Sequence, residues 1–455
     1  MKFWLLMLAV LPLTVWADKE SNDPDVLARQ GFAFLRQGNI PGAEECYSKG
    51  YKLKKITTSI ISLAGDIALA KNDREQADYY YGRAIYFDPR DTTGYMHYMR
   101  MHQKTEPQLA VTKLQQLGRY RPDIGVDRLV AHVWYSGNKV KESLAAYDSV
   151  AIDSLSRDEL VAYAMSAYLM KDFRKSLNVV AQGRRQWPGD LIFTRLAMYN
   201  HTELKEYDEA LEAAWKFFHP QPSTLHAPSV TYTYLDYIYY GYVHNGLGKY
   251  ELGIEQFNKA LQLEGGDRTD VLLAISKAYQ NIGRYEQAVS YYQQYMAKLN
   301  REEVSAYVVY ELGRLYYAWG TAKDTTNHEG AESLEHKMTG AQAPSPASLA
   351  ALKKADETFA EVARMRPDSY LGVYWQARTN VALDPETEKG LAKPYYQQVI
   401  EMTREKGGSQ LMEAYKYLAY YYYVKKDKLS AQQYIDKILD VNPMDSYALR
   451  LSAVI

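Results

Sequence analysis

The pattern of apolar and polar positions repeats itself in the middle of the chain. Residues 241–260 predict an amphipathic helix, a tight turn and a second helix, and residues 276–295 predict the same order again. The turns are at Gly248–Glu251 and Gly283–Glu286, 35 residues apart. Self-similarity at a period of this length indicates a solenoid of stacked helix pairs.

The residues of the repeated unit have distinct physical roles. Gly248 ends the first helix, because glycine adopts the left-handed cap conformation without steric cost. Glu251 falls in the first turn of the second helix, where the helix dipole favours a negative charge. Gly253 is small enough for the two helices to approach closely, and Phe257, one turn later, fills the space beside them.

The same register extends along the whole chain. We predict that the second helix of each unit crosses the first at a small residue, namely Ala43, Ala77, Ala110, Ser143, Ser176, Ala210, Gly253, Ala288, Ala355, Ala392 and Ala431. Twelve residues earlier, the first helix is small at Gly31, Gly65, Ala131, Ala164, Gly241 and Ser276, whereas Tyr98 and Met198 interrupt this column. Twelve residues later, proline ends the second helix at Pro89, Pro122, Pro188, Pro222, Pro367 and Pro443.

This pattern resembles the tetratricopeptide (TPR) repeat, which has a small residue in its first helix and Ala-x3-Phe and a terminal proline in its second. The resemblance covers Pro24–Pro443. It implies an all-α, right-handed superhelical solenoid of about eleven repeats. It also implies a scaffold that binds a protein or an extended peptide in a concave groove.

The sequence of the N-terminal residues predicts a segment that directs export and is not part of the folded protein. Met1-Lys2 is followed by the apolar run Phe3–Val15 and by a small-x-small site that ends at Ala17, so residues 1–17 read as a secretory signal peptide. We therefore expect a periplasmic protein of a Gram-negative cell envelope. No later apolar run approaches 18 residues, so no transmembrane segment is expected in the mature chain.

The repeats divide into two arrays with one interruption. Residues 24–222 hold about six repeats and residues 229–443 about five, separated by the Pro-rich linker 223–228, which either forms a hinge or lets the next helix start early. Residues 321–348 are polar, contain Pro344 and Pro346, and are expected to form a mobile loop. Residues 444–455 predict a capping helix.

Composition narrows the classes of partner. The 455 residues carry a net charge of −1, which gives no reason to expect nucleic acid as a partner. The single cysteine, Cys46, excludes an intramolecular disulfide and a thiolate zinc site, and is expected to be a small buried residue. The chain has 43 tyrosines and 10 phenylalanines, so most aromatic rings of its helices carry a hydroxyl that can remain in contact with water.

The resemblance also places a binding surface. In the TPR family, the concave face is lined by first-helix residues near the crossing position. In this sequence those residues are Phe32, Tyr95, Tyr135, Tyr168, Tyr199, Tyr242, Tyr310, Tyr317, Tyr374, Tyr420 and Tyr423. The basic and amide residues with which some members clamp a C-terminal carboxylate are missing. Asp66, His132 and Met165 occupy such places, and Arg128, Lys277, Arg314 and Arg378 are scattered.

Other chemistries have weaker support. His328, Glu332 and His336 would share one face of a helix and could bind a metal, but Gly330 interrupts the run and nothing apolar holds it down, so no metal or other cofactor is expected. No phosphate-binding, dinucleotide or nucleophile motif is present, and the repeats occupy the chain, so an enzyme is not expected. An alternative is an envelope array that binds a glycan or small ligand, since tyrosine rings also stack on sugars.

Overall fold

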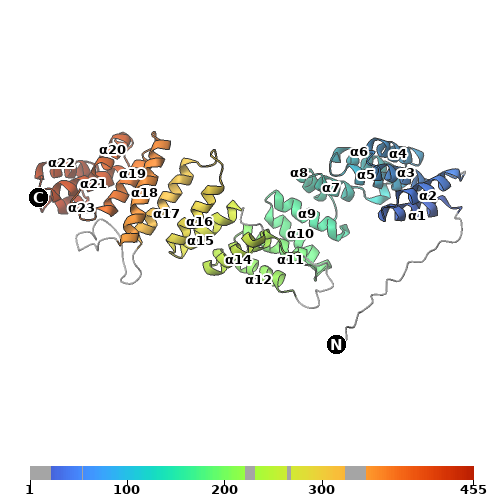
Figure 1. The fold of residues 1–455 in the computed structure, drawn as a ribbon, viewed down its shortest axis with the longest axis horizontal. Coiled ribbons are helices and arrows are strands. Elements are labelled where there is room, and N and C mark those ends of the chain that lie inside the picture. The colour runs from blue at the N-terminus through green and yellow to red at the C-terminus, as the bar shows by residue number, and fades with distance from the viewer. Residues whose placement is uncertain (1–21, 54, 221–230, 264–267, 323–344) are drawn as a thin grey trace, which may run out of the picture. The chain divides into compact units, whose positions relative to one another are not determined.

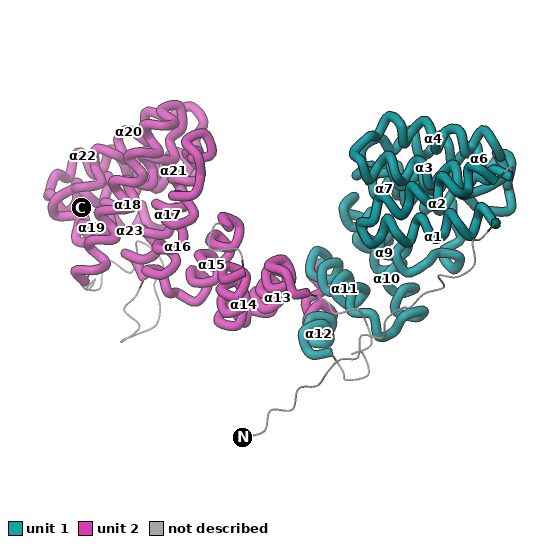
Figure 2. Tube along the Cα trace, turned by 45° about the vertical axis from the view of Figure 1, so that its right-hand side comes forward, with its two compact units in different colours: residues 1–204, 213–230 teal, residues 205–212, 231–455 magenta. Residues whose placement is uncertain are grey.

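The computed structural model describes residues 22–53, 55–220, 231–263, 268–322 and 345–455. All regular secondary structure in these segments is helical, with 23 α-helices and two short 3-10 helices (Figure 1). The all-α prediction is therefore confirmed. The chain divides into two compact units, residues 1–204 with 213–230 and residues 205–212 with 231–455 (Figure 2).

Unit 1 is a succession of helix pairs. Its helices are α1 (Pro24–Arg36) and α2 (Ile40–Lys52), α3 (Thr58–Ala70) and α4 (Arg74–Phe87), α5 (Thr92–His102) and α6 (Pro107–Tyr120), α7 (Asp127–Ser136) and α8 (Val140–Tyr147), α9 (Arg157–Leu169) and α10 (Phe173–Gln186), and then α11 (Leu191–Glu203). The 3-10 helices Pro122–Ile124 and Ile152–Ser154 follow α6 and α8. The division between the units falls within the next helix, α12 (Tyr207–Phe218).

Unit 2 continues the same succession. Its helices are α13 (Tyr234–Gly246) and α14 (Tyr250–Leu263), α15 (Thr269–Asn281) and α16 (Tyr285–Lys298), α17 (Ala306–Thr321) and α18 (Pro346–Met365), α19 (Leu371–Leu383) and α20 (Lys393–Thr403), α21 (Ser409–Val424) and α22 (Lys428–Val441), and α23 (Ser446–Ser452). In both units, a second helix packs on its own first helix and also on the first helix of the next pair. This arrangement is a solenoid, as predicted.

The small residues of the second helices lie where the two helices of a pair touch. All eleven are buried. In nine pairs the residue is the fourth of its helix. Serines reveal the contact directly, because their hydroxyls donate to the carbonyl oxygen twelve residues away: Ser143 to Ala131 (3.0 Å), Ser176 to Ala164 (2.9 Å) and Ser276 to Ala288 (2.7 Å).

Glycines of the first helices face large rings of the second. A Cβ atom on Gly65 would lie 2.3 Å from the ring of Tyr81, and one on Gly241 would lie 2.4 Å from that of Phe257. Both rings are fully buried, and each lies four residues after the small crossing residue of its helix. Glycine is therefore required at these positions by packing.

The turns and helix ends follow the same register. In eight pairs the residue two before the second helix has positive φ, and these residues are Gly38, Asn72, Asn138, Lys171, Lys205, Gly248, Gly283 and Lys426. Second helices α4, α6, α10, α18 and α22 each end two residues before a proline of the predicted column. The residue that precedes each of these prolines is extended or close to extended, because proline disfavours a helical conformation there.

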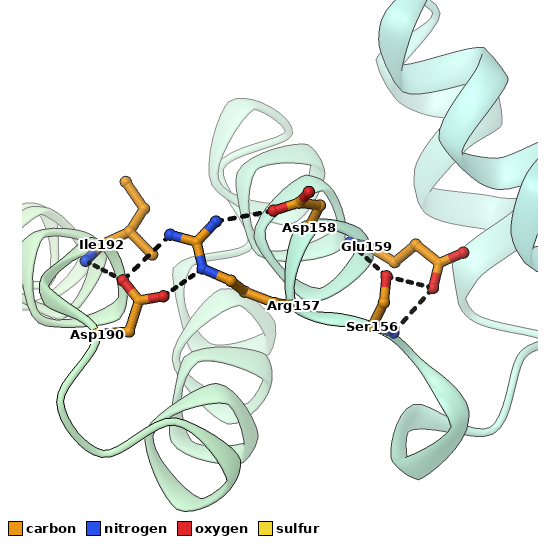
Figure 3. Close-up of polar contacts among 6 residues, drawn as sticks. All are labelled: Ser156, Arg157, Asp158, Glu159, Asp190 and Ile192. Atoms are coloured by element: carbon orange, nitrogen blue, oxygen red, sulfur yellow. Dashed lines mark hydrogen bonds and ion pairs between the residues drawn. The ribbon is translucent and has the colours of Figure 1, made fainter. Parts of the chain in front are cut away.

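Polar contacts tie the N-terminal ends of successive first helices together in unit 1. Arg157, at the start of α9, forms a two-point ion pair with Asp190, whose carboxylate also accepts from the backbone N–H of Ile192 (3.0 Å) and so caps α11 (Figure 3). Ser156 and Glu159 form a capping box at the start of α9. The Glu159 carboxylate also accepts from Arg128 of α7 (3.1 Å).

Three of the predicted segments lie wholly or partly outside the residues that the structure describes. The predicted signal peptide (1–17), the linker (223–228) and residues 323–344 of the predicted insertion lie outside the described residues. Within the described part, α18 begins at Pro346, inside the segment predicted to be a loop. The reason is local, because Ser345 accepts from the N–H of Ser348 as an N-cap and proline is favoured in the first turn. Helix α23 packs on α21 and α22.

We expect that enlarging a crossing residue destabilises the stack. Ala77→Leu and Ala288→Leu each force extra methylene groups between helices whose contact is fully buried, at a cost of about 1–3 kcal/mol. Circular dichroism melts of the full chain measure the loss. Unchanged midpoints for both variants would contradict the crossing register.

We also expect two glycine substitutions to act in opposite directions. Gly65→Ala pushes a methyl group into the Tyr81 ring and lowers the melting midpoint. Gly82→Ala, inside α4 with nothing within 4 Å of the added Cβ, is the matched control and stabilises by about 0.5–1 kcal/mol because it lowers the entropy of the unfolded chain. A stabilising Gly65→Ala would contradict the packing argument.

Candidate interaction surface

The predicted tyrosine face is uneven in its exposure. Tyr95 is fully buried and donates its hydroxyl to the Pro89 carbonyl (3.2 Å), so it offers no surface to a partner, and Tyr199 is 8% exposed. Tyr242 (38%) and Tyr423 (37%) are the most exposed members. The others are half-buried: Phe32, Tyr135, Tyr168, Tyr310, Tyr317, Tyr374 and Tyr420.

Tyr95 must therefore be removed from the predicted binding face. Its helix, α5, lacks the small crossing residue and carries Tyr98 there, and both tyrosine rings pack in one core cluster with residues of α3 and α4. Tyr95 therefore belongs to the core of these repeats. Repeats with a small crossing residue do not share this arrangement.

Three of the predicted tyrosines converge on one tryptophan in unit 2. The ring of Trp375, in α19, lies 5.2 Å from that of Tyr317, 6.1 Å from that of Tyr310 and 6.3 Å from that of Tyr374, measured between centroids. Trp375 is only 8% exposed. The tyrosines, which come from α17 and α19, therefore form the accessible edge of an aromatic cluster whose centre is buried.

Two arginines complete this group. The guanidinium of Arg314 lies 4.7 Å from the centroid of the Trp375 ring, and that of Arg378 lies 5.1 Å from it. Such cation–π contacts hold the guanidinium planes against the aromatic surface. We call Tyr310, Arg314, Tyr317, Tyr374, Trp375 and Arg378 the Trp375 cluster.

Glu413 of α21 neutralises one side of the Trp375 cluster. Its carboxylate accepts from the hydroxyls of Tyr374 (2.8 Å) and Tyr396 (2.7 Å), and lies 3.4 Å from Nε of Arg378. Arg378 is thus paired within the protein. Arg314 forms no ion pair with any residue in the described part of the chain, and one of its N–H groups donates to the Tyr310 hydroxyl (3.4 Å).

Burial and charge shape the titration of this cluster. Burial raises the pKa of Tyr317 and, with the Glu413 carboxylate, raises the pKa of Tyr374 well above its ordinary value. Burial opposes the charged form of Arg378, but Glu413 and the neighbouring tyrosines outweigh it and raise the pKa of this guanidinium. At neutral pH Tyr317 and Tyr374 therefore present neutral hydroxyls, and Arg378 presents a cationic guanidinium group.

Sequence reasoning missed Trp375 and Glu413 and took Arg314 and Arg378 as scattered. A signal was present, since Tyr310–Arg314 and Tyr374–Arg378 are the same Tyr-x3-Arg pattern in consecutive first helices. The intervening insertion stretches their separation to 64 residues and hides the repeat. Glu413 comes from the next first helix and has no pattern that connects it to the pair.

Other candidate chemistries find no support in the described residues. His328, Glu332 and His336 lie outside them, and the described part contains no group of three His, Cys, Asp or Glu side chains that could hold a metal ion. Cys46 is buried, and burial raises the pKa of its thiol. None of the described helices is both long and apolar enough to cross a membrane.

Comparison with known proteins identifies the repeat. A family model described as tetratricopeptide repeat matches residues 269–296, which span α15 and most of α16. No curated protein matches the chain.

The solved structures that are similar to the chain include two proteins with this repeat. One is the C-terminal part of a TPR repeat-containing protein from Cytophaga hutchinsonii, with 25% identity, 64% of this chain and 98% of that chain covered, and a TM-score of 0.48. The other is a tetratricopeptide repeat protein from Parabacteroides merdae, with 13% identity, 56% and 98% coverage, and a TM-score of 0.37.

The matched pair shares its register with the rest of the chain. The small crossing residue recurs in every pair from α1–α2 to α21–α22, and the left-handed turn residue recurs in eight of these pairs. Residues 269–296 therefore match the tetratricopeptide repeat, and the chain is similar to proteins that contain this repeat.

Proposed function

We propose that the chain is an exported, non-catalytic scaffold that binds a segment of a partner protein at the Trp375 cluster. Tetratricopeptide repeats generally serve as protein-interaction scaffolds. The observation that carries this proposal is the combination of half-buried tyrosine rings with Arg314, a cation without an ion-pair partner among the described residues. Aromatic and arginine side chains are the residues that most often dominate binding energy at protein interfaces.

The cluster is preorganised for such contacts. Trp375 packs against Phe359 (5.5 Å between centroids) in the core shared by α16, α17, α18 and α19, and it supports the tyrosines from below. Tyr374 is fixed by its bond to Glu413, so little side-chain entropy remains to be lost on binding. Arg314 supplies several N–H donors for a backbone carbonyl or a carboxylate of the partner.

A glycan remains the alternative ligand, and the cluster supports it less well. Stacking on a sugar needs an open aromatic face. The central ring of the cluster is largely buried and is covered by two guanidinium groups. The tyrosines present half-buried rings, which suit the edge contacts of a protein interface.

A double variant tests the proposed surface. The full mature chain is used to capture and identify partners from an envelope fraction, and the affinity of the captured partner is then measured with purified proteins. Tyr317→Ala combined with Arg314→Gln should weaken binding by about tenfold or more, since it removes one aromatic and one cationic contact. Circular dichroism checks that the variant stays folded.

The matched control removes the same residue types elsewhere. Tyr86 is 87% exposed and Arg119 is also exposed, and both lie in unit 1, so Tyr86→Ala with Arg119→Gln should leave the affinity unchanged. Equal weakening in both double variants, or capture of no protein by the wild-type chain, would contradict the proposal.

Export has its own test. The order of charge, apolar run and small-x-small site in residues 1–17 supports cleavage after Ala17. N-terminal sequencing of the protein from its native cells should therefore begin at Asp18. Recovery of a chain that begins at Met1 from the cytoplasmic fraction would exclude this part of the proposal.

A further inference from the structure

Large aromatic rings are exposed at the same end of three successive second helices in unit 1. They belong to α2, α4 and α6, and each lies within the last two residues of its helix. We call these rings the aromatic edge: Tyr51, Tyr86, Phe87 and Tyr120. Because the repeats stack in one register, the three helix ends fall on one side of unit 1.

Neither packing nor the helix dipole accounts for these rings. Tyr86 is 87% exposed and Phe87 is 54% exposed, so they contribute little to the core. Phe87 is the only exposed phenylalanine in the described part of the chain, and it has no hydroxyl to contact water. The dipole favours basic residues in a last turn but offers nothing to an aromatic ring. Exposed apolar groups gathered on one surface indicate contact with a partner or a membrane.

The unpaired charges beside the rings are cationic. The last four residues of these helices and the four that follow each contain six cationic and three acidic described side chains: Lys49, Lys52, Lys55, Arg90, Arg119 and Arg121, and Asp88, Asp91 and Asp123. Each acid is bound within the protein, Asp123 by Arg121 (2.7 Å) and the other two by backbone N–H groups. Lys52, Lys55 and Arg119 are exposed and form no ion pair with any described residue.

We propose that the aromatic edge rests on the surface of a membrane that contains acidic phospholipids. The rings enter the boundary between headgroups and acyl chains, where tyrosine is favoured because its ring is apolar and its hydroxyl stays in contact with water. The unpaired cations attract the phosphate groups of the lipids. A membrane surface can meet all three helix ends at once, since they belong to successive repeats.

This contact is distinct from the Trp375 cluster. The aromatic edge is formed by second helices of unit 1, whereas the Trp375 cluster is formed by first helices of unit 2. Attachment through exposed rings and cations is reversible and needs no spanning helix. The contact therefore does not depend on the function proposed for the Trp375 cluster.

Sedimentation of the full mature chain with lipid vesicles tests the proposal. Vesicles of phosphatidylglycerol and phosphatidylethanolamine are compared with vesicles of phosphatidylcholine, at low and at high salt. We expect binding to the acidic vesicles, much weaker binding to phosphatidylcholine, and weakening at high salt because salt screens exposed charges.

A double variant tests the residues. Tyr86→Ala with Arg119→Gln removes one ring and one cation from this surface and should weaken binding to acidic vesicles by about tenfold or more. The same variant should keep its affinity for a partner of the Trp375 cluster, so the two proposals can fail separately. The control is Tyr307→Ala with Arg29→Gln, because both side chains are exposed and neither lies at these helix ends.

Circular dichroism checks that both variants stay folded. Absence of binding by the wild-type chain, equal binding to acidic and phosphatidylcholine vesicles, or equal weakening in the variant and the control would overturn the proposal.

Discussion

Close contact between the two helices of each pair is the constraint on which the structure depends. The contact is made by a small residue of the second helix against the backbone of the first, as the bond from the Ser143 hydroxyl to the Ala131 carbonyl shows. The short separation leaves room one turn later for a single large residue. Tyr81 and Phe257 fill that room against Gly65 and Gly241.

Some of the tyrosines use the same geometry. A ring that fills the contact within one pair reaches beyond it with its para substituent, and a hydroxyl there can bond to a polar group in the stack. Tyr292 donates to the carbonyl of Val308 in the next pair (3.1 Å), and Tyr396 donates to Glu413 (2.7 Å). Phenylalanine would fill the same space but would leave these acceptors without the bond. Tyr292 and Tyr396 thus serve both packing within a repeat and hydrogen bonding between repeats.

The difference between contacts within a pair and contacts between repeats explains what could be predicted from the sequence. The fold was predictable because the close contact between the two helices of a pair requires particular residues at a fixed spacing within that pair. Gly253 and Phe257 are an example. The candidate surface was predictable only in part. Tyr310, Tyr317 and Tyr374 follow from the register, whereas Trp375 and Glu413 acquire their roles from neighbours in other repeats. Such contacts depend on the rotation of each first helix, which the position of a small residue sets only approximately. Tyr95 is an example, because its side chain lies in the core together with that of Tyr98, which stands where most first helices have a small residue.

The positions that face away from the pair contact are therefore free to vary in chemistry. In unit 1 the ends of three second helices carry exposed rings and unpaired cations, whereas in unit 2 first helices bring tyrosines and two arginines around a buried tryptophan. A scaffold built from one repeated contact can thus carry different recognition surfaces along its length, because the residues that hold it together and the residues that face a partner occupy separate positions of the repeat.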